Sequence, residues 1–124
     1  MAILSSIPVL NCLSIKETSD FYQQILQFVV VNKREMSGEL RWVHLMHGST
    51  TLMLQSIKQQ HPAPPGAQFS NIILYFNVNN INDMHHYVKA KHKNVSDIKH
   101  TDYKMLEFTL GDPEGNIITL GQKA

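Results

Sequence analysis

The sequence has very little cysteine, no long hydrophobic run and no excess of charge, and each absence excludes a class of protein. With Cys12 as the one cysteine among 124 residues, an intrachain disulfide is impossible, which favours a reducing, cytoplasmic location. No apolar run approaches the roughly 18 residues of a membrane span, so no membrane partner is expected. The N-terminal stretch lacks a basic flank and contains Pro8, and we therefore do not expect a signal peptide.

The charge balance argues against a nucleic-acid partner. The formal net charge is +1, and charged residues make up 17% of the chain. The lysines are spread along the sequence rather than gathered in a basic stripe, so no nucleic-acid partner is expected. Hydrophobic residues make up 43%, which is ordinary for a globular protein, and 124 residues suffice for one domain that buries about two-thirds of its unfolded surface.

The two halves of the chain show the same plan. Ser14 and Glu17 have the spacing of a helix capping box, and Asn80 and Asp83 mark a second helix start in the other half. Helices are expected over about 15–27 and 81–92. The apolar positions recur at helical spacing and predict these buried residues: Ile15, Phe21, Ile25 and Leu26 in the first helix, and Ile81, Met84, Tyr87 and Val88 in the second.

Strands surround both predicted helices. One strand precedes each helix, over 7–10 and 71–78, and a hairpin follows each: 41–47 with 50–56 around Gly48-Ser49, and 104–111 with 117–121 around a turn that contains Gly115. A Pro-rich linker of about 59–67 separates the halves. We therefore predict an α+β fold with repeats at about 1–58 and 68–124. The two βαβββ repeats would form an open, curved mixed sheet with the helices on its convex face.

Strand alternation predicts which side chains face the concave side of the sheet. A two-residue turn at Gly48-Ser49 sets His44 opposite Met53 and Trp42 opposite Gln55. The core face then carries Val43, Leu45, Leu52 and Leu54, and the concave face carries Trp42, His44, Met46, Thr51, Met53 and Gln55.

The second half is interpreted in the same way. The inward residues are Ile72, Leu74, Phe76, Val78, Leu106, Phe108, Leu110, Ile118 and Leu120, and the concave residues are Ile73, Tyr75, Asn77, Met105, Glu107, Thr109, Ile117 and Thr119. A mainly apolar and aromatic surface with a few polar groups is typical of an organic-ligand site. The candidate ligand-binding residues are Trp42, His44, Met53, Gln55, Ile73, Tyr75, Asn77, Glu107 and Thr119.

Each of the polar and aromatic candidates has two interpretations. His44 is either an acid–base or hydrogen-bonding group for a ligand or a histidine satisfied by its neighbours. Glu107 either pairs with a cationic ligand or is an exposed rim residue paired with lysine. Trp42 and Tyr75 either stack on a ligand or fill an open sheet face, for example at a dimer contact. Asp112 is interpreted as a turn residue and not as a chemical one.

Five short motifs carry a resemblance to a known family: Ile7-Pro8-Val9-Leu10, Asp20-Phe21-Tyr22, Leu52-Met53-Leu54-Gln55, Leu74-Tyr75-Phe76-Asn77-Val78 and Asp112-Pro113-Glu114-Gly115-Asn116. With these motifs in this order and at this spacing, the chain resembles the glyoxalase, bleomycin-resistance and extradiol-dioxygenase superfamily, also called the vicinal oxygen chelate proteins. The resemblance covers nearly the whole chain and implies the paired βαβββ fold.

The resemblance also implies four metal-ligand positions, at Pro8, Met53, Ile73 and Thr119. None of these side chains donates as the His and Glu ligands of metal-dependent members do. We therefore expect no metal and no other cofactor. Pro8 and the Leu-Met-Leu-Gln motif make the chain more similar to the bleomycin-resistance branch, whose members bind drugs in a groove without chemistry.

The preferred hypothesis is thus a metal-independent binding protein that holds a small or medium organic ligand. The chain is not acidic, which argues against cationic bleomycin itself as that ligand. The resemblance implies a homodimer. The alternative is an enzyme, either a glyoxalase-type lyase or isomerase with displaced ligands or a metal-free acid–base catalyst, with His44 and Glu107 as the candidate catalytic residues. A third possibility is a module whose open sheet binds a protein.

Overall fold

The structure of the protein is a computed structural model that describes residues 1–57 and 72–124. The chain divides into two compact units, Met1–Ala63 and Pro64–Ala124, which are described in turn. The expected linker over residues 59–67 lies outside the described residues.

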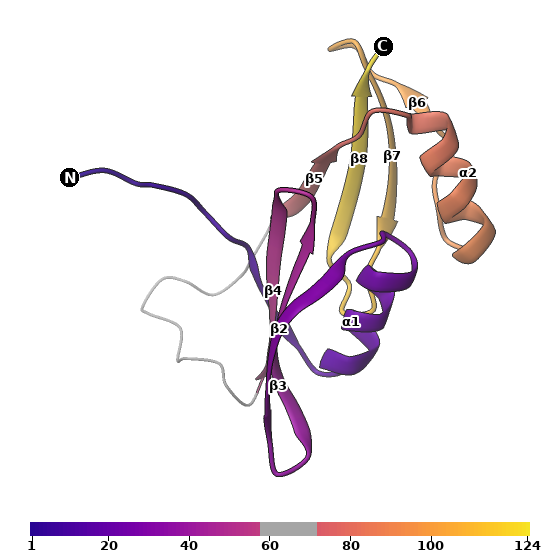
Figure 1. The fold of residues 1–124 in the computed structure, drawn as a ribbon. Helices are drawn as coiled ribbons and strands as arrows, with labels where there is room; N and C mark the ends of the chain where they lie inside the picture. Colours follow the sequence, from indigo (N-terminus) through magenta and orange to yellow (C-terminus); the bar gives the residue numbers. More distant parts are fainter. Residues whose placement is uncertain (58–71) are drawn as a thin grey trace. The chain divides into compact units, whose positions relative to one another are not determined.

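The first unit is one βαβββ repeat. Its elements are β1 (Val9–Cys12), α1 (Ile15–Gln24), β2 (Val29–Met36), β3 (Glu39–His47) and β4 (Thr50–Ser56). They form a four-stranded sheet of order β1-β4-β3-β2, in which β1 is parallel to β4 and the other pairs are antiparallel (Figure 1). β1 begins at Val9, later than expected, and the preceding Pro8 contributes its carbonyl, which accepts a hydrogen bond from the Met53 N–H at 2.9 Å.

The second unit repeats this topology. Its elements are β5 (Ile73–Asn77), α2 (Ile81–Lys91), β6 (Lys99–His100), β7 (Met105–Gly111) and β8 (Ile117–Lys123). The sheet order is β5-β8-β7-β6, again with the first and last strands of the repeat parallel. The α+β class and the two open, mixed βαβββ repeats are therefore confirmed, with one four-stranded sheet in each unit.

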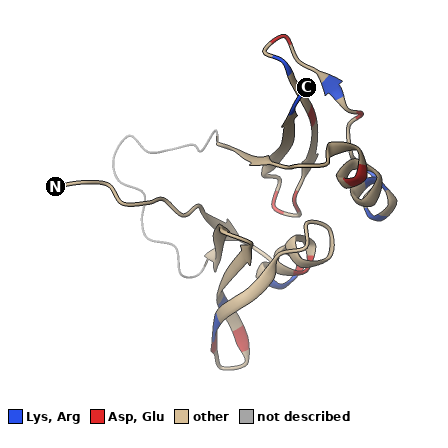
Figure 2. Cartoon of the chain, turned by 45° about the horizontal axis from the view of Figure 1, so that its top comes forward, with Lys and Arg blue, Asp and Glu red and all other residues tan. Residues whose placement is uncertain are grey.

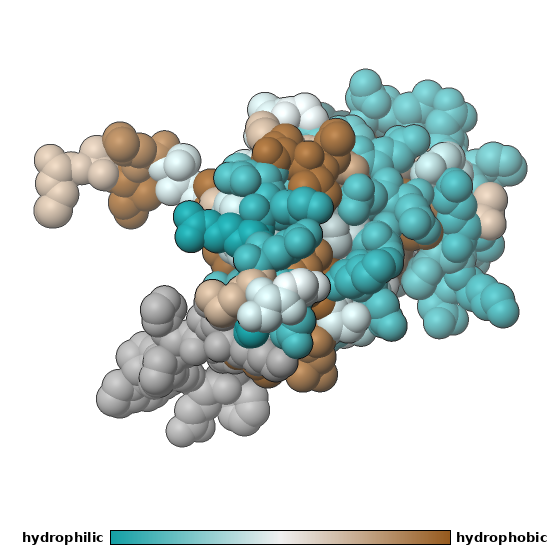
Figure 3. All heavy atoms as spheres, turned by 60° about the horizontal axis from the view of Figure 1, so that its bottom comes forward, coloured by the Kyte–Doolittle hydropathy of each residue, from teal (hydrophilic) through white to brown (hydrophobic). Residues whose placement is uncertain are grey.

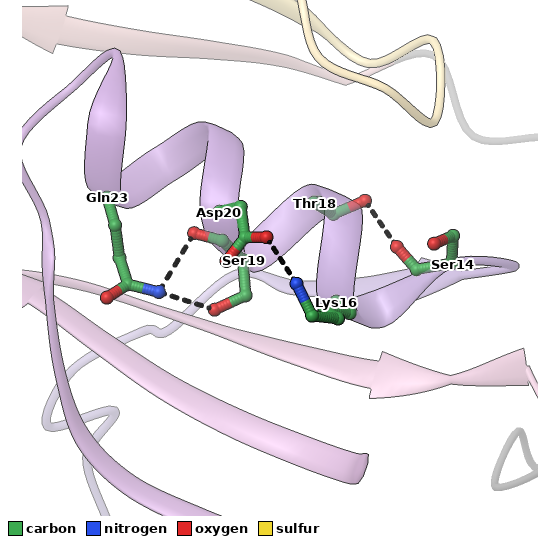
Figure 4. A network of polar contacts seen from close by, with 6 residues as sticks. All are labelled: Ser14, Lys16, Thr18, Ser19, Asp20 and Gln23. Atoms are coloured by element: carbon green, nitrogen blue, oxygen red, sulfur yellow. Dashed lines mark hydrogen bonds and ion pairs between the residues drawn. The ribbon is translucent and has the colours of Figure 1, made fainter. Parts of the chain in front are cut away.

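The helix starts were located correctly, but only one cap forms as predicted. Asn80 caps α2, because its side-chain oxygen accepts from the Asp83 N–H at 3.4 Å. Ser14 occupies the N-cap position of α1 without a side-chain cap hydrogen bond, so the capping-box prediction is wrong. The Ser14 carbonyl accepts the first helix hydrogen bond, from the Thr18 N–H at 3.1 Å, and a second bond from the Thr18 hydroxyl at 3.0 Å (Figure 4).

Polar pairs one turn apart line α1. Lys16 and Asp20 form an ion pair at 2.8 Å, and the Gln23 amide donates to the carbonyl and hydroxyl oxygens of Ser19 (Figure 4). Such exposed pairs add only a few tenths of a kcal/mol, so the helix depends mainly on the burial of its apolar side. α1 ends at Gln24, before the expected residue 27, and Gln27 has a positive φ of 60° that is incompatible with a continuing helix.

The core of the first unit lies between α1 and one face of its sheet. The alternation prediction is confirmed, because the inward strand residues and the apolar side of the helix segment are buried: Ile15, Phe21, Ile25, Leu26, Val43, Leu45, Leu52 and Leu54. Tyr22 is fully buried and packs edge-on against Phe21 and Phe28, with ring centroids 5.2 and 5.8 Å away. Each fully buried large apolar side chain contributes roughly 1.5–3 kcal/mol, which fixes the face that α1 covers.

In the second unit, α2 packs on β7 and β8 in the corresponding way. The buried residues are Leu74, Ile81, Val88, Phe108, Leu110, Ile118 and Leu120. Met84, Tyr87, Phe76, Val78 and Leu106 are only half-buried, because the helix covers its sheet less completely than predicted. Ile72 was expected to be inward but is 72% exposed, because it precedes β5 and is not held by the sheet.

Charged and apolar residues are distributed over the surfaces of both units. Acidic and basic positions are interspersed on the strands and helices of the two units (Figure 2). Figure 3 shows apolar residues as patches on an otherwise largely hydrophilic surface. Among the described residues, no helix is long and apolar enough to cross a bilayer.

Candidate functional site

Each sheet has one face that the helix of its own unit does not cover, and we call this its open face. The predicted register of the first hairpin is confirmed: Trp42 pairs with Gln55 and His44 pairs with Met53. Because Val43 and Leu45 point toward α1, the alternating Trp42 and His44 belong to the open face. All four of these candidate residues are half-buried, so the structure brings them together on one accessible surface.

The Thr51 hydroxyl and the Trp42 ring hold the His44 side chain in place. Its Nε2 hydrogen bonds to the Thr51 hydroxyl, and its ring lies 6.0 Å from the Trp42 ring. His47 behaves differently, because its Nδ1 contacts the Leu26 carbonyl at 3.1 Å and its ring packs against Phe28. The two histidines therefore have separate partners, as their odd spacing on a strand predicts.

Trp42 has a neighbour that the sequence did not reveal. Arg34 of β2 is paired with Trp42, and its guanidinium carbon lies 6.0 Å from the centre of the indole ring. On the other side, the Gln55 amide donates to the Asn11 side-chain oxygen at 2.7 Å. A planar aromatic surface bordered by a cation and two amides can stack on an organic ring and hydrogen bond to its substituents.

The open face of the second unit contains Ile73, Tyr75, Asn77, Glu107 and Thr119. These residues come from neighbouring strands, because Tyr75 pairs with Thr119, Asn77 pairs with Gly121, and Gly121 pairs with Glu107. Ile73 and Tyr75 are 52% and 41% exposed. Thr119, in contrast, is only 7% exposed, because it lies in the inner strand β8 between Tyr75 and Thr109.

Tyr75 spans the sheet to reach Glu107. The two residues lie on β5 and β7, on either side of β8, and the Tyr75 hydroxyl donates to Glu107 Oε2 at 2.7 Å. This reach depends on Gly121, because the hydroxyl and ring of Tyr75 occupy the space that a Cβ at position 121 would need. Because Gly121 has no side chain, the Tyr75 ring can cross β8 at this position.

A second tyrosine completes the cluster. The Tyr103 hydroxyl lies 2.8 Å from both Glu107 oxygens. The turn before β7 holds Tyr103 in place, because the Thr101 hydroxyl accepts from the Met105 N–H at 2.9 Å and the Thr101 carbonyl accepts from the Lys104 N–H at 3.2 Å. Tyr103 was not predicted, because it lies in a loop where strand alternation gives no orientation. We call Tyr75, Tyr103 and Glu107 the Tyr–Glu–Tyr cluster.

The cluster stabilises the neutral form of both phenols. Desolvation, followed by the hydrogen bond and the charge of Glu107, raises the pKa of Tyr75 to about 12. The hydrogen bond to Glu107 is also the main reason why the pKa of Tyr103 is raised. Both hydroxyls therefore remain hydrogen-bond donors to Glu107 through the neutral pH range.

The residues at the four implied metal positions do not fit a metal ion. The Pro8 carbonyl is already bonded to the Met53 N–H, and neither Ile73 nor Pro8 has a side-chain donor atom. Thr119 is a lone hydroxyl, and within residues 1–57 and 72–124 no group of three or more His, Cys, Asp or Glu side chains could hold a metal ion. The donor chemistry that the metal-dependent relatives require is thus not present at these positions.

The fold and the open faces define an α+β protein of paired βαβββ repeats with candidate sites for an organic molecule. By sequence, the chain belongs to the Glyoxalase/Bleomycin resistance protein/Dioxygenase superfamily, which it matches over residues 8–120. No curated protein matches the chain significantly.

Solved structures of the same fold include proteins with several functions. A bleomycin-binding protein in complex with bleomycin is 18% identical, with a TM-score of 0.70 over 98% of this chain and 100% of that one. TnmS3, an antibiotic binding protein from Streptomyces sp. CB03234, is 17% identical, with a TM-score of 0.73 over 100% of both chains. A glyoxalase-related enzyme from Clostridium phytofermentans is 16% identical, with a TM-score of 0.76 over 100% of this chain and 98% of that one. At these identities the likeness shows the shared fold.

Proposed function

We propose that this protein is a metal-independent binding protein of the bleomycin-resistance type, which holds a small or medium organic ligand against its open faces. One observation supports the proposal most strongly. Pro8, Met53, Ile73 and Thr119 stand where metal-dependent relatives have their ligands, and the open faces of the sheets are mainly apolar and aromatic. Such a surface favours ligand burial and stacking over metal chemistry.

The partners of each open-face residue suggest a role in binding. Trp42 offers a ring for stacking, and the amides of Gln55 and Asn77 offer donors and acceptors that fix a ligand's orientation. His44 is a hydrogen-bonding group tied to Thr51, and Glu107 supplies the negative charge of the cluster. Two proteins of the same fold, the bleomycin-binding protein and the antibiotic binding protein TnmS3, bind organic molecules, which supports this proposal. The homodimer, the cytoplasmic location and the enzyme alternative stay predictions.

Trp42 provides a direct test, because it is the one tryptophan in the chain. Planar aromatic compounds, such as naphthalene, anthraquinone and flavone derivatives, are screened for saturable quenching of its fluorescence in a chelator-containing buffer. The affinity of a compound found in this way is then measured by calorimetry. Replacing Trp42 with Ala should weaken binding about five-fold or more, which corresponds to roughly 1 kcal/mol of lost stacking.

Two variants serve as controls for this test. Trp42→Phe keeps a ring face and should retain most of the affinity, and Tyr87→Phe alters a residue of α2, on the helix-covered side of its own sheet, and should change nothing. Equal affinity in Trp42→Ala and the unmodified protein would contradict the proposed role of this open face. Binding that appears only after a divalent metal is added would contradict metal independence.

A further inference from the structure

Among residues 1–57 and 72–124, the carboxylate of the Tyr–Glu–Tyr cluster has no cationic partner. Glu107 is half-buried, and its contacts are the hydroxyls of Tyr75 and Tyr103. Within the described part of the chain, no Lys, Arg or His nitrogen forms an ion pair with it. The lysine partner of the exposed-rim interpretation is thus not found among the described residues.

We propose that this cluster is the subsite for a protonated amine, an inference that rests on the proposed function and names the chemical class of its ligand. A carboxylate has about four acceptor positions, so the hydroxyls of Tyr75 and Tyr103 leave capacity for an ammonium N–H. Hydrogen bonds between ionised partners are about twice as strong as neutral ones. The exposed rings of Tyr75 and Tyr103 add π faces that attract a cation.

The surroundings provide room for the rest of such a ligand. A hollow of about 480 Å³ shares Glu107 with the cluster and is lined by Ser96, Asp97, Ile98, Lys99, Glu107, Phe108 and Thr109. This volume is within the range of small-molecule sites. The amine would thus contact Glu107 while the ligand's apolar part occupies the hollow next to it.

Lys99 determines how tightly an amine binds. It is the β6 residue paired with Glu107 and lines the same hollow, yet the ion pairs of the described residues do not include one between its ammonium and the Glu107 carboxylate. An incoming ammonium group meets the positive charge of Lys99, which competes with it for Glu107. Removing this charge should strengthen amine binding, whereas removing the charge of Glu107 should abolish it.

The test uses benzylamine, which combines a planar ring with a protonated amine, together with neutral benzyl alcohol and anionic benzoate. Amide shifts in NMR spectra of the full chain are followed during titration at low salt. Benzylamine should shift the signals of Tyr75, Glu107 and Gly121 saturably, with a dissociation constant on the order of 1 mM. Benzyl alcohol and benzoate should shift them far less, and added salt should weaken the benzylamine effect.

Two variants make the outcome decisive. Glu107→Gln keeps a carbonyl oxygen for the tyrosine hydroxyls and should lose benzylamine binding while it stays folded, with a melting temperature lowered by only a few degrees. Lys99→Met should bind benzylamine several-fold more tightly. Equal shifts with benzyl alcohol, no saturable shift with benzylamine, or full binding by Glu107→Gln would each overturn the amine subsite. The Trp42 fluorescence screen judges the proposed function separately, since its readout comes from the other unit.

Discussion

Replacing Asp112 with Ala should lower the free energy of unfolding by about 2–4 kcal/mol, the largest effect we expect from a residue outside the apolar core. Asp112 is a buried residue, only 7% exposed, and its carboxylate organises the turn between β7 and β8. One oxygen accepts from the N–H groups of Glu114 and Asn116, and the other accepts from the Asn116 amide, all at 2.9 Å. Alanine removes every one of these acceptors and leaves the backbone donors without their partner.

The measurement is denaturant unfolding of three variants. Asp112→Asn keeps one acceptor oxygen and should cost roughly half as much as Asp112→Ala. Asp102→Ala removes an exposed carboxylate from another turn of the same unit and should stay within about 0.5 kcal/mol of the unmodified protein. If Asp112→Ala were as stable as Asp102→Ala, the structural role of the Asp-Pro-Glu-Gly-Asn turn would be wrong.

Replacing Gly121 with Ala should dismantle the Tyr–Glu–Tyr cluster. The new Cβ would occupy the position of the Tyr75 hydroxyl, so the ring must move and lose its hydrogen bond to Glu107. We expect a destabilisation of about 1–2 kcal/mol from the clash and the lost hydrogen bond. Gly111→Ala is the matched control, because its Cβ would meet only an ordinary contact at 3.8 Å from the Asn116 carbonyl oxygen. A strand glycine without a positive φ gains slightly from alanine, so the control should be neutral or slightly stabilised.

The titration of Tyr75 gives a second readout for Gly121→Ala. Because the pKa of Tyr75 is raised to about 12, its contribution to stability is complete below its ordinary pKa near 10 and is lost as the pH rises through the folded-state value. Phenolate formation is followed by ultraviolet absorbance in the unmodified protein and in Tyr75→Phe. The difference between the two titration curves isolates the titration of Tyr75 from that of the other tyrosines among the four in the chain. In Gly121→Ala the Tyr75 phenolate should form at lower pH than in the unmodified protein. An unchanged titration would show that the ring does not depend on Gly121.

The hairpin registers were predictable because two local signals agree. The Gly48-Ser49 turn fixes the pairing of β3 with β4, and the alternation of Val43 and Leu45 with Trp42 and His44 fixes the face. A shift of one residue would have exposed the leucines, so the hydrophobic pattern strongly disfavours any other register.

The sequence predicted two residues of the Tyr–Glu–Tyr cluster but neither their contact nor the third residue. Tyr75 and Glu107 were assigned to the open face by alternation, but their contact depends on a ring that crosses β8 over a glycine. Tyr103 precedes β7 in a turn stabilised by Thr101, and loop residues have no periodicity from which to infer direction. The α1 cap could not be predicted fully either, because the Ser-x-x-Glu spacing locates the N-cap position at Ser14 but does not show whether the side chain makes the cap hydrogen bond.

The central claim is that the protein holds its ligand without a metal, and metal content tests it most directly. Protein purified without an affinity tag or chelator is analysed for elements, and its melting temperature is taken before and after adding nickel, zinc, manganese or iron(II). We expect far less than one ion per chain and no upward shift in melting temperature, because Pro8, Met53, Ile73 and Thr119 do not form a ligand set. One tightly bound ion per chain with clear stabilisation would contradict it.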